Sequence, residues 1–271
     1  MEEYEETGDG VFQGKMDMFK GITVDLEKVK TPPKTDQEFE DRLLASLKHY
    51  RETGIRGVWI KISIKQCSFI PVAVKHGFVY HHCYPTFIVV TQWLPKDEPN
   101  SLPTFATTYI GVAGFVVRDD GQLLVVKERF RTQDHWKLPG GMADYNEDIR
   151  ETARREVLEE TGIEAEFVSL VCIRHIPDFR FGCSDLYFVC LMTPKSTEIK
   201  FDAKEIADAK WMEMEAFISS PHVNDSNKFI ARTFKDNFLQ EGRKLKIVPT
   251  QMRLFNRDLI YYSIDFPSHK L

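Results

Sequence analysis

Three glutamates at helical spacing are the residues in this sequence that could do chemistry together. Glu156, Glu159 and Glu160 stand at positions i, i+3 and i+4, a spacing that places side chains on one face of a helix. Three carboxylates close together repel one another, so the cluster should raise carboxylate pKa values or recruit a cation. All the candidate ligands are oxygens and no His or Cys lies between Gly140 and Ile163, which favours Mg²⁺ or Mn²⁺ over zinc.

The choice of metal also bears on the substrate. Mg²⁺ in proteins commonly binds the phosphates of a substrate beside a few carboxylates, so the ligand set suggests a substrate that carries phosphate. Taken alone, however, an acidic run on a helix is usually a solvated surface. The residues around the triplet decide between the two interpretations.

Local elements are predicted to position the carboxylates. We expect a helix from about Glu147 to Thr161, ended by Gly162 in the left-handed conformation that glycine adopts readily. Ile149, Ala153 and Val157 form a narrow apolar stripe that would lay this helix against a sheet. The Gly140–Gly141 pair before the helix would let the backbone pass near a metal with no Cβ in the way.

The whole segment resembles the signature of the Nudix hydrolases, and it matches that signature without a departure. The matching positions are Gly141, Glu147, Arg155, Glu156, Val157, Glu159, Glu160, Gly162 and Ile163. The resemblance implies an α/β fold, the Nudix α/β/α sandwich, and metal-dependent hydrolysis of nucleoside diphosphates linked to another moiety. It also implies that Glu156, Glu159 and Glu160 bind Mg²⁺ or Mn²⁺, with the Gly140 carbonyl as a further ligand, and that Arg155 and Glu147 orient loop and helix.

A second acidic candidate lies outside the signature. Glu205 comes a few residues before Trp211 in an expected loop, where several Nudix enzymes carry an acidic residue that helps to bind metal or acts as general base. A single loop glutamate is more often only solvated. The general base therefore stays open between Glu205 and a glutamate of the signature.

The layout of the chain is similar to a subgroup of the family. Residues 1–34 suit a mobile tail, 35–103 a small α/β domain, 104–245 the Nudix domain and 246–271 a C-terminal extension. This arrangement resembles the plant Nudix enzymes acting on ADP-ribose and NADH, and the animal Nudix protein encoded antisense to basic fibroblast growth factor. The resemblance suggests ADP-ribose or NADH as substrate, with AMP and a second phosphomonoester as products. It also suggests an acyltransferase-like first domain, for which we expect a packing or dimerisation role.

Further residues are candidates for substrate binding. Arg174 and Phe181 follow a predicted strand. Arg129 and Arg131 precede the signature and are candidates for phosphate contact. Arginine binds phosphate through two parallel hydrogen bonds and aromatic rings stack on bases. The alternative is that the aromatic residues pack under the loop and that Arg174 pairs with a surface acid.

Composition excludes several classes of protein. Lys and Arg total 36 against 41 Asp and Glu, a net charge of −5, so the basic excess of a nucleic-acid binder is missing. The five scattered cysteines include no Cys-x-x-Cys pair and are predicted to be reduced core thiols of a cytoplasmic protein. No apolar stretch approaches the roughly 20 residues that span a bilayer. The alternatives to the leading hypothesis are a Nudix hydrolase for an oxidised nucleotide, CoA or a diphosphoinositol phosphate, and a non-catalytic nucleotide-sensing or partner-binding protein.

Overall fold

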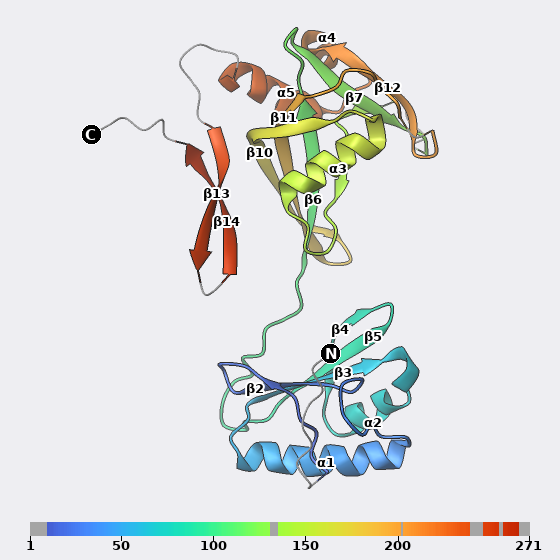
Figure 1. The fold of residues 1–271 in the computed structure, drawn as a ribbon, viewed down its shortest axis with the longest axis vertical. Coiled ribbons are helices and arrows are strands. Elements are labelled where there is room, and N and C mark those ends of the chain that lie inside the picture. The colour runs from blue at the N-terminus through green and yellow to red at the C-terminus, as the bar shows by residue number, and fades with distance from the viewer. Residues whose placement is uncertain (1–9, 131–134, 202, 239–245, 255–256, 266–271) are drawn as a thin grey trace, which may run out of the picture. The chain divides into compact units, whose positions relative to one another are not determined.

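The chain forms two compact units, Met1–Ala106 and Thr107–Leu271, each of which mixes helices with sheet (Figure 1). The structure is a computed structural model that describes residues 10–130, 135–201, 203–238, 246–254 and 257–265. The mixed α/β class predicted from the sequence is confirmed.

The first unit is a five-stranded sheet with two helices. The strands lie in the order β1 (Lys15–Met16), β2 (Gly21–Asp25), β3 (Gly57–Ser63), β5 (Phe87–Trp93) and β4 (Val79–Tyr84). Helix α1 (Asp36–Glu52) is capped by Thr35, whose Oγ1 accepts a hydrogen bond from Glu38 N at 3.1 Å, and α2 (Phe69–Lys75) follows β3. The apolar face of α1, including Phe39, Leu43 and Leu47, packs into the core of the unit.

The expected tail over residues 1–34 is wrong for the part of it that the structure describes. Strand β2 pairs in parallel with β3, and Phe12, Val24 and Leu26 are fully buried. The pairing joins segments more than 30 residues apart. The local composition of residues 1–34, which is acidic and contains glycine, could therefore not reveal it. Residues 1–9 lie outside the described part of the chain.

The expectation of core cysteines is wrong for two residues of the first unit, because Cys67 and Cys83 are exposed. In the same unit, His81 and His82 bring their Nδ1 atoms within 2.6 Å of each other, although neighbouring side chains of a regular strand point to opposite faces. The pairing of β4 with β5 shifts register between Tyr80 and His82, and such a bulge breaks the alternation of side chains.

Besides a two-stranded sheet near the C-terminus, the described part of the second unit contains two larger sheets. One has the order β10 (Ala165–Arg180), β11 (Cys183–Pro194), β6 (Thr108–Val116) and β9 (Gly140–Met142), and the other has the order β12 (Ile206–Glu213), β7 (Gln122–Glu128) and β8 (Trp136–Lys137). The sequence predicts a hairpin of β6 and β7 around Arg118–Gly121, but these strands belong to different sheets and share only the bridge between Val117 and Leu123. The turn forms as expected, and the strands then separate so that both contribute side chains to the same core, as Phe115 and Val125 do.

Helices cover both faces of the sheet that contains β6 (Figure 1). Val112 and Val116 pack with Ala153 and Val157 of α3 (Ile149–Thr161). The alternate residues, such as Phe115, pack with residues of α4 (Met214–Ser219) and α5 (Asp225–Phe238). This is the α/β/α sandwich that the resemblance implies.

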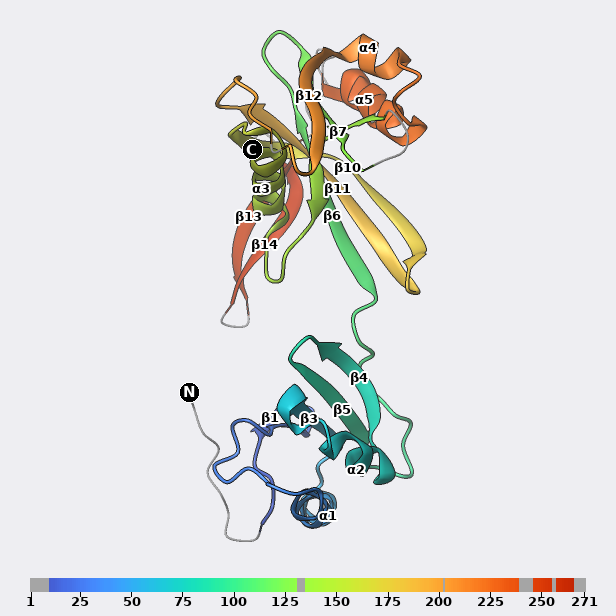
Figure 2. The ribbon, with the colours of Figure 1, turned by 90° about the vertical axis from the view of Figure 1, so that its right-hand side faces the viewer.

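The C-terminal extension forms a hairpin of β13 (Lys246–Leu254) and β14 (Arg257–Asp265), in which β13 lies beside β10 (Figure 2). Ile247 N donates to Ser169 Oγ at 2.9 Å, and the Tyr262 ring meets Phe167 edge-on, with centroids 6.0 Å apart. The Tyr262 hydroxyl donates to Asp148 Oδ1 at 2.9 Å. Within the described ranges, no helix is both long and apolar enough to cross a membrane.

Candidate active site

Helix α3 carries the predicted carboxylates and is fixed at both ends. Asp148 caps its start, where Oδ1 accepts from Arg150 N at 3.0 Å, and Gly162 ends it with φ of 71°. The apolar stripe of α3 lies close to β6, because a Cβ placed on Gly114 would come within 2.3 Å of Val157 Cγ2. Strand β9 pairs with β6, so this close packing brings the Gly140–Gly141 backbone beside α3.

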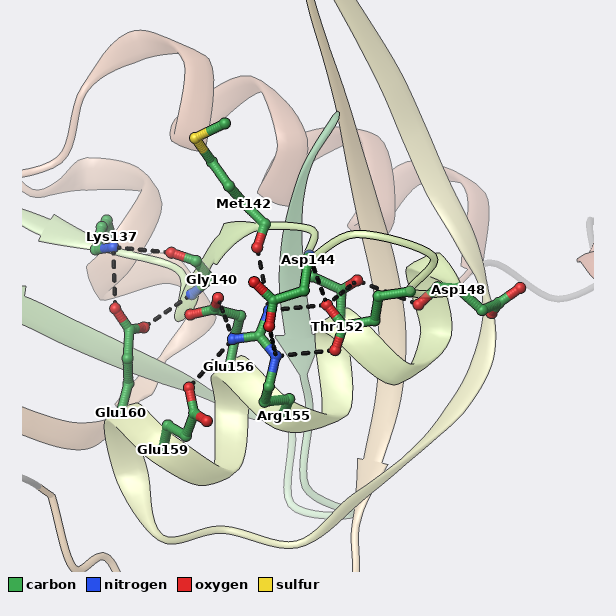
Figure 3. A network of polar contacts seen from close by, with 11 residues as sticks. Lys137, Gly140, Met142, Asp144, Asp148, Thr152, Arg155, Glu156, Glu159 and Glu160 are labelled. Atoms are coloured by element: carbon green, nitrogen blue, oxygen red, sulfur yellow. Dashed lines mark hydrogen bonds and ion pairs between the residues drawn. The ribbon is translucent and has the colours of Figure 1, made fainter. Parts of the chain in front are cut away.

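Arg155 holds the loop and the helix together (Figure 3). Its Nε donates to Glu147 Oε1 at 2.8 Å and its Nη2 to Glu147 Oε2 at 2.9 Å and to the Met142 carbonyl at 3.0 Å. Its Nη1 donates to Glu156 Oε1 at 2.7 Å and to Glu159 Oε2 at 3.2 Å. The hydrogen bonds from Arg155 lower the pKa of Glu147 to about 2 against the opposing effect of burial. The structure thus joins the two residues for which the sequence suggests an orienting role.

Glu160 is buried between the backbone of β9 and a lysine. Its Oε2 accepts from Gly140 N at 2.8 Å, and its Oε1 lies 3.3 Å from Lys137 Nζ. The same ammonium donates to the Gly140 carbonyl at 3.2 Å and pairs with Glu128 Oε1 at 2.8 Å. Burial raises the pKa of Glu160, and the charge of Lys137 acts in the opposite direction.

Glu156 lies next to the glycine pair. A Cβ on Gly141 would come within 2.6 Å of Glu156 Oε1, so only glycine leaves room for the carboxylate there. Burial raises the pKa of Glu156 while the hydrogen bond from Arg155 lowers it. In Figure 3, Glu156 and Glu160 project from α3 toward the Gly140 backbone.

The three glutamates share a helix face but do not converge on one point. Glu159 points toward Arg155 and its side chain is 60% exposed. Among the residues that the structure describes, no three acidic, histidine or cysteine side chains are arranged as a metal-binding group. The three carboxylates are held apart by two positively charged side chains, because Arg155 binds Glu156 and Glu159 while Lys137 binds Glu160.

The oxygen atoms around Gly140 nevertheless fit a hard divalent cation. Glu160 and the Gly140 carbonyl already share a positive group, the Lys137 ammonium. The raised pKa values of Glu156 and Glu160 show carboxylates that burial destabilises in their charged form, and a cation relieves that cost. All of these donors are oxygens, which Mg²⁺ and Mn²⁺ prefer.

A pocket of about 340 Å³ opens beside these oxygens. Gly140, Gly141, Glu128 and Lys137 form one part of its wall, and residues of β6, the β10–β11 hairpin and the start of α5 form other parts. Its further lining residues are Tyr109, Gly111, Met142, Arg174, Phe179, Arg180, Phe181, Asp185, Tyr187, Asn224, Ser226 and Asn227. The pocket therefore joins the carboxylate site to a surface with arginines and aromatic rings.

Two of the predicted substrate-binding residues line this pocket. Arg174 lies in β10, where its Nη2 donates to the buried Asp185 at 2.8 Å and its guanidinium stacks 4.5 Å from the Tyr187 ring centre. Phe181 lies at the hairpin tip with φ of 53° and a side chain that is 93% exposed. Arg174 was expected either to line a substrate pocket or to pair with a surface acid. In the structure it lines a pocket and also pairs with an acid, although that acid is buried.

The structure does not bring Glu205 or Arg129 into the pocket. Glu205 is exposed in the turn before β12, and its carbonyl accepts from Arg129 N at 2.8 Å. The Arg129 side chain donates to the Ala203 carbonyl. Neither is among the described residues that line the pocket, and Arg131 lies outside the described part of the chain.

Sequence reasoning missed Glu128 and Lys137. Both belong to strands that border the signature, β7 and β8. A signal was present, because Glu128 comes two positions after the buried apolar run 123–126 and Lys137 stands three residues before Gly140. Lys137 contacts both Glu128 and Glu160, and the place of Lys137 beside Glu128 depends on the pairing of β7 with β8, which the sequence did not reveal.

Comparison with known proteins decides the family. A model of the Nudix hydrolase domain matches residues 12–94, and a model of the NUDIX domain matches residues 107–233. Nudix hydrolase 7 of Arabidopsis thaliana is 32% identical over 94% of this chain and 91% of its own length. The chain belongs to the Nudix hydrolase family.

Other Nudix relatives are similar over shorter ranges. Nudix hydrolase 8 of Arabidopsis thaliana is 38% identical over 79% of this chain, which spans only 58% of that protein's length. The mouse protein named nucleoside diphosphate-linked moiety X motif 6 is 38% identical over 81% of this chain and 71% of its own. A solved MutT Nudix hydrolase from Burkholderia pseudomallei is 25% identical over 46% of this chain and 97% of its own, with a TM-score of 0.40. Nudix hydrolases are pyrophosphatases that generally use divalent metal ions.

Proposed function

We propose that this Nudix protein hydrolyses the pyrophosphate bond of a nucleoside diphosphate linked to another moiety, with ADP-ribose or NADH as substrate. The products would be AMP and a second phosphomonoester. The observation that carries the proposal is the position of Glu160 and the Gly140 carbonyl, which share one cation at the wall of a pocket lined on its other side by arginines and aromatic rings.

The proposed metal ligands are the Glu156 and Glu160 carboxylates and the Gly140 carbonyl, with Glu159 nearby on the same helix face. Mg²⁺ or Mn²⁺ bound there would neutralise the phosphate oxygens and lower the pKa of a bound water. Arg155 contributes by holding Glu156 and Glu159 on the side of α3 that faces the Gly140–Gly141 loop. Glu147 in turn fixes Arg155 from the loop.

The rest of the pocket supports a nucleotide substrate. Its volume of about 340 Å³ lies within the range of roughly 300–1,000 Å³ for small-molecule sites. Arg174 and Arg180 can bind phosphate, and Tyr109 and Phe181 offer ring faces on which a base can stack. The name of the mouse relative, which refers to a nucleoside diphosphate-linked moiety, is consistent with this class of substrate.

The general base remains a choice between a glutamate of the signature and Glu205. The exposed position of Glu205 outside the pocket lining favours a glutamate of the signature in the arrangement described here.

A substrate panel tests the proposal. The purified chain would be incubated with ADP-ribose, NADH, CoA, an oxidised nucleoside triphosphate and a diphosphoinositol phosphate, each with Mg²⁺ and with Mn²⁺. We expect AMP from ADP-ribose or NADH with either metal and none after chelation. Activity confined to any of the other compounds would contradict the assignment of ADP-ribose or NADH as substrate. If no compound is hydrolysed, the proposed enzymatic activity is contradicted.

A further inference from the structure

Lys137 occupies the centre of the carboxylate site although it is no part of the family signature. Its Nζ lies 2.8 Å from Glu128 Oε1, 3.3 Å from Glu160 Oε1 and 3.2 Å from the Gly140 carbonyl. An ammonium has three donors, and here each of them has an oxygen partner. The lysine side chain is only 18% exposed and that of Glu160 only 11%.

This contact offsets the cost of burying Glu160. A carboxylate removed from water is strongly destabilising unless a counter-charge and hydrogen bonds compensate it. Lys137 supplies the charge and Gly140 N supplies a hydrogen bond. Without the ammonium, Glu128 and Glu160 would lose the positive group that they share.

The ammonium and a divalent cation cannot share these oxygens. Two of the three atoms that hold Lys137 Nζ, Glu160 Oε1 and the Gly140 carbonyl oxygen, belong to groups that the proposed function assigns to metal binding. Like charges a few ångströms apart repel strongly in a partly buried site. One cation must therefore leave when the other binds, and Lys137 can turn into the pocket that it lines.

We propose that Lys137 is the internal counter-cation of this site, which holds the Glu128, Glu160 and Gly140 oxygens together in the metal-free enzyme and gives them up when a divalent cation binds. The inference rests on the proposed function, because it needs a metal at Glu160. It assigns Lys137 a positioning role, and two measurements that do not depend on turnover report on that role. These are the thermal stability of the metal-free chain and the affinity for Mn²⁺ alone.

The test compares Lys137→Met with Lys137→Arg in the full chain. After chelation, Lys137→Met should lower Tm by about 3 °C or more, since Glu160 stays buried without its counter-charge. In calorimetric titration it should bind Mn²⁺ about tenfold more tightly than the wild type, because the competing charge is gone. Lys137→Arg keeps the charge and should stay near the wild type in both measurements.

Lys210→Met is the matched control. It also removes one positive charge, from a lysine whose Nζ lies 4.1 Å from the ring centre of Trp136, the residue before Lys137, but Lys210 is not among the described pocket-lining residues. We expect Mn²⁺ affinity to stay the same and Tm to fall less than in Lys137→Met, since only the contact with the Trp136 ring is lost. If Lys137→Met does not fold, Lys137→Gln repeats the comparison with a hydrogen-bond donor and no charge.

The outcomes separate the inference from the proposed function. Equal or weaker Mn²⁺ binding by Lys137→Met than by a wild type that binds clearly would overturn the role of Lys137 and leave the metal site standing. If Lys210→Met also binds Mn²⁺ more tightly, the change in net charge explains the gain, and this result would overturn the role of Lys137 too. Failure of every form, the wild type included, to bind Mn²⁺ or Mg²⁺ would overturn both.

Discussion

Arg155 and Glu147 are joined by two parallel hydrogen bonds, Nε to Oε1 at 2.8 Å and Nη2 to Oε2 at 2.9 Å. Because Arg155 also donates to Glu156 and Glu159, this pair links the loop before α3 to the carboxylates on the helix. The geometry of the proposed metal site thus depends on a residue that would not touch the metal.

Replacing Arg155 with lysine should damage both activity and stability. Lysine keeps the charge but cannot reproduce the two-point contact, so we expect a loss of about 2–3 kcal/mol in the free energy of unfolding and a fall in kcat. Urea unfolding and steady-state hydrolysis measure the two effects. Arg154→Lys is the control, because Arg154 forms an exposed pair with Glu151. Equal behaviour of the two variants would contradict the role of Arg155.

The same ion pair predicts acid sensitivity. Arg155 lowers the pKa of Glu147 from 4.5 to about 2 in the folded chain, so the unfolded chain binds the proton first as the pH falls. The stabilisation is complete above about pH 4.5 and is lost between pH 4.5 and 2. Glu147→Gln should therefore be less stable than the wild type at neutral pH and lose less stability over that interval. Urea unfolding at a series of pH values tests this, and parallel curves would count against it.

The two glycines before the helix should respond differently to alanine. At Gly140, with φ of 154°, an added Cβ would lie 2.2 Å from the Val112 carbonyl oxygen. Since a backbone atom cannot move aside easily, we expect Gly140→Ala to cost about 2–4 kcal/mol of stability.

At Gly141 the nearest atom is the carboxylate oxygen of Glu156, 2.6 Å from the added Cβ. That side chain can move, so Gly141→Ala should keep most of the stability and lose hydrolysis. Thermal melts and AMP release on both variants decide the matter. An active Gly141→Ala chain would show that the position of Glu156 is unimportant.

The C-terminal hairpin should stabilise the second unit. Ending the chain at residue 245 removes Ile247 and Tyr262, which pack against the core beneath α3, and we expect a loss of about 2–4 kcal/mol. Tyr262→Phe removes only the hydrogen bond to Asp148 and should cost about 0.5–1.5 kcal/mol. Denaturant unfolding of both chains measures the difference. A shortened chain as stable as the wild type would show that the hairpin contributes nothing to the fold.

The sequence predicted the elements whose information is local. The helix that became α3 was recognised from its apolar stripe and its terminal Gly162, and the structure buries Ala153 and Val157 as that stripe requires. The start of α1 is local in the same sense, because its capping residue Thr35 accepts from the backbone N of Glu38, three residues on. In these places, neighbouring residues determine the conformation.

Features that depend on distant pairing could not be predicted. Strand β2 was missed because its partner β3 lies more than 30 residues away. Strands β6 and β7 separate because of how their side chains pack in the core. The turn sequence between them, Arg118–Gly121, does not indicate that the two strands join different sheets. The role of Lys137 could not be predicted for the same reason. Its position beside Glu160 depends on the pairing of β7 with β8 and of β9 with β6.

The most direct test of the central claim is AMP release from ADP-ribose by Glu160→Gln. Glu160 is the buried carboxylate nearest the Gly140 backbone, and glutamine keeps its shape without the charge that holds a cation. The account predicts metal-dependent AMP release by the wild type and by the exposed-site control Glu151→Gln, with a loss of about 100-fold or more in Glu160→Gln at unchanged circular dichroism. Undiminished hydrolysis by a folded Glu160→Gln chain would contradict it.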